Sequence, residues 1–298
     1  MLILITGATG QLGKELVKIT SNNHQVRGVS SSDFDITDLA STGEYISELD
    51  PDVIVHSAAY TDVDGCEENE DKAYKVNGLG ARNVAIVARE VGAKIVHIST
   101  DYVFDGKGQD PYREFDSPNP QSVYGESKLL GEQFIKEQLP RHYICRVAWL
   151  YGEQGDNFLK SMLDLVGVKE KLEVVDDQFG SPTWTKNVAL QIEELISGKA
   201  FGTYHCTSQG SCNWYEFALE IFKNAGYKLK PLEKEGVELV DEAGNITQVK
   251  PVPSEKFERP APRPRSSILE NYMLDLQGLN KMPYWENSLS KFIDSYCL

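Results

Sequence analysis

The sequence predicts an α/β fold in which a doubly wound parallel sheet is followed by a smaller C-terminal α/β lobe. The first observation is that short β-branched runs alternate with helical patterns through the first half of the chain. The second is a glycine-rich turn over residues 7–13, directly after the first apolar run. The third is that this alternation loosens after Trp149. We therefore expect the sheet to occupy residues 1–150, and residues 151–298 to form mainly the second lobe.

The strands of the sheet are expected where apolar residues run on without alternation, because such strands are buried on both faces. These runs lie at 2–5, 53–55, 95–98 and 143–147, and the second strand is expected around 25–29. Apolar residues at helical spacing lie between them, at Leu12, Leu16 and Ile19 and then within 73–91 and 124–139. Parallel strands joined by helices give right-handed crossovers, so the order of elements supports one sheet with helices on both faces.

The second half predicts helices at 158–166, 187–196 and 214–225. We expect the helix near 186–198 to return to the first sheet. Residues 231–265 are rich in proline, and Gly244-Asn245 is typical of a hairpin turn between strands at 237–240 and 246–249. This segment therefore predicts loops and a hairpin on the smaller lobe.

Composition excludes several classes of protein. The 298 residues carry 30 Lys+Arg against 45 Asp+Glu, a formal net charge of −15, whereas nucleic-acid-binding proteins usually present a basic face. No apolar run reaches the roughly 18 residues of a membrane helix, so we expect no membrane partner. The five cysteines show no zinc-ligand spacing, so we expect reduced thiols, a cytoplasmic protein and no metal.

The glycine-rich turn Thr6-Gly7-Ala8-Thr9-Gly10-Gln11-Leu12-Gly13 has the pattern GxxGxxG between a strand and a helix. Glycines there let the backbone approach a pyrophosphate, and the helix N-terminus offers free N–H groups to it. The alternative is an ordinary glycine-rich β–α turn. The position of the motif favours a Rossmann-type dinucleotide site, and the sheet is expected to be of that type.

The second strand of such a fold normally ends in an acidic residue that binds the adenosine ribose. This chain has Ser30-Ser31-Ser32 there, and acidic residues follow only at Asp33 and Asp35. No arginine in the serine run would hold a 2′-phosphate. The strand end therefore leaves both NADPH and NADH open as cofactors.

Tyr124-Gly125-Glu126-Ser127-Lys128 is a YxxxK motif, which puts the phenol and the ammonium on one face of a helix. We expect the lysine charge to lower the pKa of the tyrosine and so suit it to proton transfer. Upstream, Ser99 and Thr100 end a strand at the edge where ligands bind in parallel sheets. These features predict a nicotinamide-dependent site with Thr100, Tyr124 and Lys128 as its catalytic residues.

Several longer stretches point further: ITGATGQLG, HSAAYTDVDGCE, STDYVFDG, VYGESKLLGE, RVAWLYG and GSPTWT. With these the chain resembles the extended short-chain dehydrogenase/reductase superfamily and, within it, the dTDP-4-dehydrorhamnose reductase family. The resemblance implies that NADPH or NADH reduces the 4-keto group of dTDP-4-dehydro-L-rhamnose to give dTDP-L-rhamnose for cell-wall polysaccharide. It also implies a monomer or homodimer that binds a dTDP-sugar.

The resemblance and the motifs together assign two sets of binding residues. For the cofactor these are Gly7, Gly10, Gln11, Leu12, Gly13, Ser30, Asp35, Ile36, Ala58, Ala59, Tyr60, Ser99, Tyr124 and Lys128. For the substrate they are Val63, Thr100, Tyr102, Trp149, Asn157 and Arg263. We expect the Trp149 indole at the floor of the cleft beside the sugar, and Arg263 on its diphosphate.

Two alternatives remain at this point. One is a sugar-nucleotide epimerase or dehydratase of the same superfamily, which would retain its NAD tightly. The other is a non-catalytic regulatory subunit that resembles the reductase, although the intact Thr100, Tyr124 and Lys128 set argues against lost activity. The segment 231–258 also looks longer than is usual for the family, by roughly a hairpin.

Overall fold

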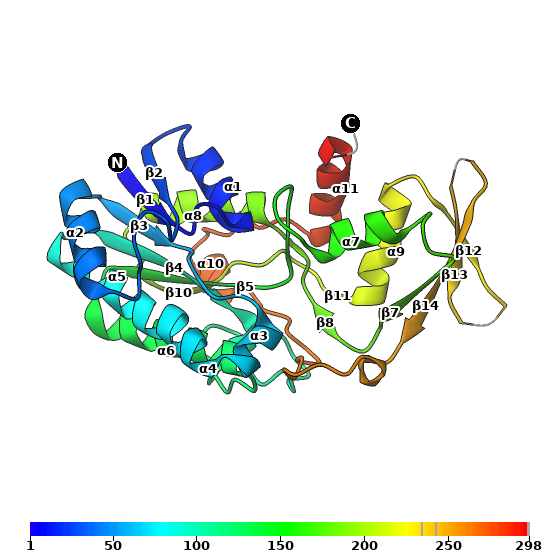
Figure 1. Cartoon of the computed structure of the whole chain (residues 1–298). Helices are drawn as coiled ribbons and strands as arrows, with labels where there is room; N and C mark the ends of the chain where they lie inside the picture. Colours follow the sequence, from blue (N-terminus) through cyan, green and yellow to red (C-terminus); the bar gives the residue numbers. More distant parts are fainter. Residues whose placement is uncertain (234, 242, 297–298) are drawn as a thin grey trace.

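The computed structural model describes residues 1–233, 235–241 and 243–296. Its centre is a six-stranded sheet in the order β10-β5-β4-β3-β1-β2, in which every pair of neighbours is parallel (Figure 1). The strands are β1 (Leu2–Thr6), β2 (Gln25–Val29), β3 (Val53–His56), β4 (Lys94–Thr100), β5 (His142–Val147) and β10 (Gly202–His205). The expected α/β class and the first five strands are confirmed.

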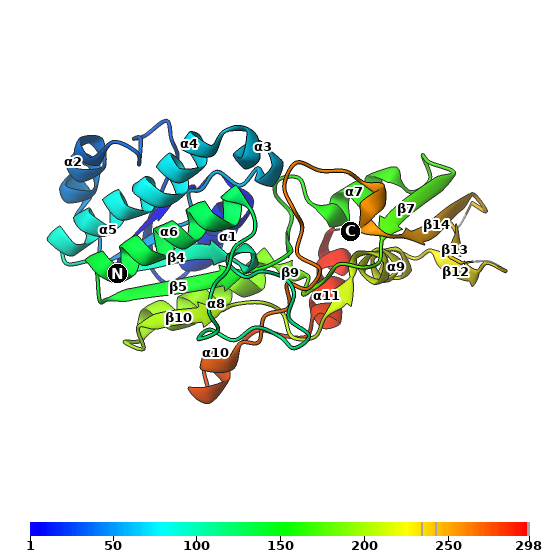
Figure 2. The same cartoon turned by 90° about the horizontal axis from the view of Figure 1, so that it is seen from below.

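Helices cover both faces of this sheet, and alternate residues of each strand supply the two cores. Ile3 and Ile5 of β1 pack with α1 (Gln11–Thr20) and α8 (Thr185–Ser197), whereas Leu4 packs on the other face. That second face is covered by α2 (Leu39–Leu49), α5 (Ala81–Glu90) and α6 (Val123–Gln138) (Figure 2). The inner strands β1, β3, β4 and β5 are therefore buried on both faces, as their apolar runs indicated, whereas β2 at the edge of the sheet is largely exposed.

The helix predicted over 73–91 is not one regular helix. Short helices α3 (Val63–Glu68) and α4 (Glu70–Ala73) lead into a π-helix, Tyr74–Gly80, before α5 begins. In that segment the Asn77 amide donates to the Tyr60 carbonyl at 3.0 Å and to the Ser127 hydroxyl at 3.0 Å. The wider turn thus lets a polar side chain tie this helix to α6.

The smaller lobe has its own core and a four-stranded sheet in the order β12-β13-β14-β7. The hairpin predicted at Gly244 is confirmed, because β13 pairs antiparallel with β14. The bounds are β7 (Lys171–Val175), β12 (Lys228–Pro231), β13 (Val237–Val240), β14 (Ile246–Val252), α7 (Phe158–Leu165), α9 (Trp214–Asn224) and α11 (Trp285–Tyr296). Short strands complete the chain: β6 (Leu150–Tyr151), β8 (Phe179–Gly180), β9 (Thr183–Trp184) and β11 (Cys212–Asn213).

Parts of the second half of the chain return to the first sheet. Helix α8 packs on α1, β10 pairs with β5, and α10 (Tyr272–Leu276) lies beside β10 (Figure 2). Cys66, Cys145, Cys206 and Cys212 are buried and free, and Cys297 is outside the described residues. None of the helices in the described part of the chain is long and apolar enough to cross a membrane.

Candidate active site

A cavity of about 630 Å³ lies at the carboxyl ends of the sheet strands. Its wall includes the last residues of four strands: Thr6 of β1, Val29 of β2, Thr100 of β4 and Val147 of β5. This edge is where open parallel sheets bind their ligands. The cavity is therefore the candidate active site.

Most residues that the sequence assigned to a site line this cavity. They are Gly7, Gly10, Gln11, Leu12, Gly13, Ser30, Asp35, Ile36, Ala58, Ala59, Val63, Ser99, Thr100, Tyr102, Tyr124, Lys128 and Trp149. The fold thus brings positions 7 to 149 to one wall. Tyr60, Asn157 and Arg263 do not line it.

The glycine turn forms a backbone cradle that other residues could not form. Gly7 has a φ of +68°, and a Cβ on it would lie 2.7 Å from the backbone nitrogen of Ala58. A Cβ on Gly13 would lie 2.1 Å from the carbonyl oxygen of Gly7. Gly10 precedes α1 and has no side chain to cap it, so the first N–H groups of α1 are left for a phosphate.

The loop after β2 brings a carboxylate, that of Asp33, back to the end of the strand. The loop after Ser30 folds back, and Asp33 accepts hydrogen bonds from the Ser30 N–H at 2.8 Å and the Ser30 hydroxyl at 3.1 Å. The backbone hydrogen bond from Ser30 is the main cause that lowers the pKa of Asp33. A negative charge therefore stands at the strand end after all, three residues later in the chain than usual.

Helix α6 begins where it does because Ser122 caps it, accepting the N–H of Gly125 at 3.2 Å. A Cβ on Gly125 would lie 2.2 Å from the carbonyl oxygen of Tyr102, so this glycine lets the helix lie directly on the segment after β4. The Tyr102 and Tyr124 rings meet edge to face, with 5.5 Å between their centroids. The first turn of α6 is thereby fixed beside the end of β4.

Lys128 lies one helical turn further on and is 3% exposed. Its ammonium donates to the carbonyl oxygen of Ile98 at 2.6 Å. Burial lowers the pKa of Lys128 to about 8, and the carboxylate of Glu132 opposes that shift. The group is therefore charged at neutral pH, but close enough to its pKa to lose the proton in mild alkali.

Tyr124 is held in its neutral form. Burial raises the pKa of this phenol well above its ordinary value, and a hydrogen bond with Thr100 is the next cause, in the opposite direction. The expectation that the pKa of Tyr124 is lowered is therefore wrong, because burial and the neighbouring Asp101 both raise it and only the hydrogen bond with Thr100 lowers it. A neutral phenol at the cavity wall is the form that can donate a proton.

Asp101 is a site residue that the sequence analysis missed. It lines the cavity, and the Thr100 hydroxyl donates to its Oδ1 at 2.9 Å. Burial raises the pKa of Asp101 to about 6. The signal was present in the sequence, since Asp101 directly follows the Ser-Thr strand end. Its carboxyl fixes the direction in which the Thr100 hydroxyl points.

Trp149 lines the cavity as expected, but its indole is stacked on Trp214, which the sequence did not assign to the site. The ring centroids are 3.5 Å apart and the planes differ by 4°. Trp149 has a φ of +46°, a conformation that is strained for a bulky side chain. Because Trp149 follows β5 and Trp214 starts α9, the pair joins the end of the sheet to the smaller lobe.

Arg263 lies in a separate pocket of about 230 Å³ that shares Tyr102 with the main cavity. Its Nη2 donates to the carboxylate of Asp64 at 2.8 Å, and its Nη1 donates to the carbonyl of Ala261. Its guanidinium is thus partnered within the chain. The contact with Asp64 holds the segment around Arg263 against α3, just before Ser266, which pairs with Phe179 of β8. The guanidinium is not part of the main cavity wall.

The other two assigned residues, Asn157 and Tyr60, lie outside the cavity wall. The Asn157 amide donates to the Gln11 side chain at 3.0 Å, and its oxygen caps α7 by accepting the Lys160 N–H. The Tyr60 ring lies under the ammonium of Lys72, 4.2 Å from ring centroid to nitrogen. Asn157 therefore contacts the cavity wall through Gln11, and Tyr60 is not part of that wall.

Comparison with known proteins shows the family to which the chain belongs. The whole chain, residues 1–298, matches the family described as the RmlD substrate binding domain. The spore coat polysaccharide biosynthesis protein SpsK of Bacillus subtilis is 39% identical over 292 residues, covering 98% of this chain and 96% of that protein. A dTDP-4-dehydrorhamnose reductase of Clostridium acetobutylicum superposes with a TM-score of 0.92 at 44% identity, over 100% of both chains. The dTDP-4-dehydrorhamnose reductase of Bacillus anthracis, in complex with NADP, gives 0.90 at 41% identity over 99% of both.

Proposed function

Since the chain belongs to the RmlD substrate binding domain family, we propose that it reduces the 4-keto group of dTDP-4-dehydro-L-rhamnose with NAD(P)H, giving dTDP-L-rhamnose. It is an NAD(P)H-dependent oxidoreductase of nucleotide-sugar biosynthesis. The observation that carries the mechanism is that Thr100, Tyr124 and Lys128 share one cavity wall with the glycine cradle. A proton donor and a dinucleotide site thus open into the same space.

The residues present fit a dinucleotide. The cradle of Gly7 and Gly13 lacks the Cβ atoms that would fill it, and the start of α1 offers N–H groups to a pyrophosphate. Ser30 and Asp35 would hold the adenosine end, and Lys128 the nicotinamide ribose. When bound, NAD(P)H supplies the hydride that is transferred to the sugar carbon.

The proton comes from this chain. The neutral Tyr124 phenol donates to the oxygen that becomes an alkoxide, and the charged Lys128 stabilises the tyrosinate left behind. In this structure the Thr100 hydroxyl donates its one proton to Asp101, so it would have to turn that proton from Asp101 to the substrate oxygen to stabilise the alkoxide. General acid catalysis of this kind contributes about 10²–10⁴-fold to the rate.

We also propose a division of labour between the two parts of the chain. Residues 1–150, with α8 packed on α1, bind the cofactor, and residues 151–298 mainly bind the sugar nucleotide. Val63, Tyr102 and Trp149 form the boundary where the sugar would lie. Asn157 and Arg263 act indirectly: Asn157 holds the Gln11 side chain by a hydrogen bond, and Arg263 holds Asp64 by an ion pair.

The setting of the enzyme follows from the same reasoning. We propose that it works in the cytoplasm, where its four buried free cysteines stay reduced, as a monomer or homodimer. Its product would supply polysaccharide synthesis at the cell surface, as the name of the Bacillus subtilis relative suggests for that protein.

Replacing Tyr124 with Phe tests the mechanism. Turnover of dTDP-4-dehydro-L-rhamnose, followed by the loss of NADPH absorbance, should fall about 10²–10⁴-fold, while the Kd for NADPH stays within a few-fold. Tyr74→Phe is the matched control, because the Tyr74 hydroxyl bonds Glu126 outside the cavity. A Tyr124→Phe enzyme with near-normal kcat would refute the proposed donor. Stoichiometric NAD in the purified protein would instead favour an epimerase or dehydratase.

A further inference from the structure

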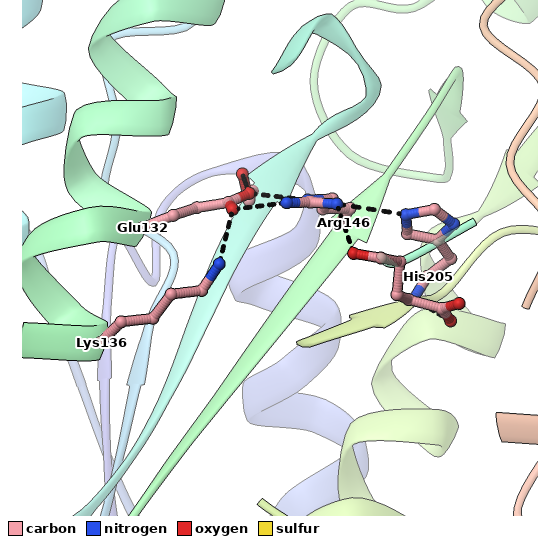
Figure 3. Close-up of polar contacts among 6 residues, drawn as sticks. Glu132, Lys136, Arg146 and His205 are labelled. Atoms are coloured by element: carbon pink, nitrogen blue, oxygen red, sulfur yellow. Dashed lines mark hydrogen bonds and ion pairs between the residues drawn. The ribbon is translucent and has the colours of Figure 1, made fainter. Parts of the chain in front are cut away.

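Glu132 lies in the middle of α6, one helical turn beyond Lys128 and on the same face. It is 0% exposed. Its Oε1 accepts the Ser99 hydroxyl at 2.6 Å. Oε1 also accepts Nε of Arg146 at 2.9 Å, and Oε2 accepts Nη2 of Arg146 at 2.8 Å (Figure 3). This carboxylate therefore joins the helix that carries Lys128 to the ends of two strands.

Arg146 of β5 is 1% exposed, and its remaining contacts are with neutral groups. Its Nη1 lies 3.5 Å from Nε2 of His205 and 3.5 Å from the carbonyl oxygen of Glu114 (Figure 3). Nδ1 of His205 donates to the carbonyl of Glu270, so Nε2 is the acceptor. Burial lowers the pKa of His205 to about 3, so the ring is neutral. Glu132 is thus the carboxylate in direct contact that balances the Arg146 charge.

The surroundings of Lys128 give this carboxylate a second effect. Burial lowers the pKa of His56 to about 3 and that of His97 well below its ordinary value, so both rings beside Lys128 are neutral. Glu132 is the group whose charge favours the protonated lysine. The titratable and charged groups around the lysine are His56 on β3, His97 on β4, Tyr124 and Glu132 on α6 and, beyond Glu132, Arg146 on β5 and Lys136 on α6.

A buried ion pair is a poor way to gain stability alone, because desolvation of both charges offsets their attraction, and apolar residues of similar size often serve as well. Glu132 instead does two things that an apolar residue could not do. It accepts the hydroxyl of Ser99, the residue before Thr100, and it places a negative charge one turn from Lys128.

We propose that Glu132 is a positioning residue of the reductase: held by Arg146 and Ser99, its carboxylate fixes α6 against the end of β4 and keeps the Lys128 ammonium charged. The inference rests on the proposed role of Lys128. Without the Glu132 charge, burial acts on Lys128 unopposed and its pKa falls below about 8. Lys128 then loses its proton at a lower pH, so the alkaline limb of the pH–rate profile moves down, by about one unit.

Glu132→Gln is the direct test, because the amide keeps an acceptor for Ser99 but removes the charge. For this variant we expect kcat/KM, measured against pH with NADPH and dTDP-4-dehydro-L-rhamnose, to fall on the alkaline side at a pH about one unit lower than in the wild type. Glu132→Asp keeps the charge but shortens the side chain. In this variant kcat/KM should fall at nearly the wild-type alkaline pH, while kcat drops about tenfold. The comparison separates the effect of the carboxylate charge on Lys128 from the effect of the carboxylate position on α6. Lys136→Met is the control, since Lys136 contacts Glu132 from the half-exposed surface, and its limb should not move.

Glu132→Gln leaves the Arg146 charge buried without its partner, so the variant can fail to fold. The double variant Glu132→Gln, Arg146→Met removes both charges. Its kcat/KM should fall at the same lowered alkaline pH as in Glu132→Gln. If either folded variant keeps the wild-type limb and kcat, or if neither folds, Glu132 is a structural residue only and the inference is overturned.

Lys128→Arg separates this outcome from failure of the proposed function. Arginine does not lose its proton in this range, so the alkaline limb should disappear in Lys128→Arg. If the limb stays in that variant, Lys128 does not set it and the proposed role of Lys128 fails. If it disappears while Glu132→Gln leaves the limb in place, only the role of Glu132 fails.

Discussion

Gly180→Ala should displace the Trp149 indole without touching the cofactor site. Gly180 ends β8, and a Cβ added to it would lie 2.3 Å from Cε2 and 2.4 Å from Nε1 of Trp149. Ordinary contact begins at 3.4 Å, so the ring or the strand must move by at least 3.4 − 2.3 = 1.1 Å. The stack on Trp214 prevents a simple retreat, because its centroid is 3.5 Å away.

The magnitude follows from that displacement. A shift of about 1 Å in a group that positions the substrate can cost about 10²-fold in kcat/KM. Loss of the aromatic pair adds about 0.5–1.5 kcal/mol, up to roughly tenfold. We expect KM for dTDP-4-dehydro-L-rhamnose to rise about tenfold and kcat/KM to fall about 100-fold. The Kd for NADPH should stay within a few-fold, because Gly180 is far in the chain from the cradle and does not line the cavity.

The assay is steady-state NADPH oxidation with each substrate varied in turn, together with near-ultraviolet circular dichroism to follow the stacked indoles. Gly43→Ala is the matched control, since the same Cβ added within α2 meets Val87 at an ordinary 4.0 Å. An unchanged KM in a Gly180→Ala enzyme whose tryptophan signal has changed would refute the role of Trp149. A collapse of NADPH affinity would refute the proposed division between the two lobes.

Three further predictions concern the cofactor end and the C-terminal segment. Gly13→Ala should weaken NADPH binding at least tenfold, measured by fluorescence titration, because its Cβ meets the backbone of Gly7 at 2.1 Å. Asp33→Asn should raise the kcat/KM ratio of NADPH over NADH several-fold, since it removes a negative charge from the end of β2 that opposes a 2′-phosphate; an unchanged ratio would place that phosphate elsewhere. Arg263→Ala and Asp64→Asn should raise KM for the sugar nucleotide by similar factors, because each breaks the same 2.8 Å ion pair. A much larger effect of Arg263→Ala would mean that its guanidinium also contacts the diphosphate directly.

The parts of the fold that the sequence predicted are those set by local pattern and burial on both faces. Four of the first five strands, β1, β3, β4 and β5, are short apolar runs, and α1 and α6 have apolar stripes at helical spacing. The two-residue strands behaved differently. β8 and β11 exist because Phe179 and Gly180 pair with Asn213 and Cys212 from far along the chain. β7 is likewise a strand because β14 lies parallel to it, which no local pattern could reveal.

The site divides in the same way. Residues on the glycine turn and at the ends of strands line the cavity because strand and helix geometry fixes where they point. Arg263 was assigned from the resemblance and from its positive charge, and neither shows which carboxylate in the folded chain lies nearest to its guanidinium. Asp64 takes its guanidinium at 2.8 Å. Asp33 shows the reverse case, since a loop that folds back brings a charge to a strand end that the linear sequence leaves neutral.

The stretch VYGESKLLGE illustrates how much of the site one helix carries and what it cannot show alone. Tyr124, Lys128 and Glu132 are spaced by four, so they lie along one face of α6. The sequence explains the first two, because a proton donor and a cation are what a carbonyl reduction needs. It leaves the glutamate unexplained, since an acid on a helix is usually solvated. Only the packing of β5 supplies the reason: Arg146 meets Glu132 there with 1% and 0% of the side chains exposed. A buried cation beneath the strand ends needs an anion, and α6 places that anion where it also acts on Lys128.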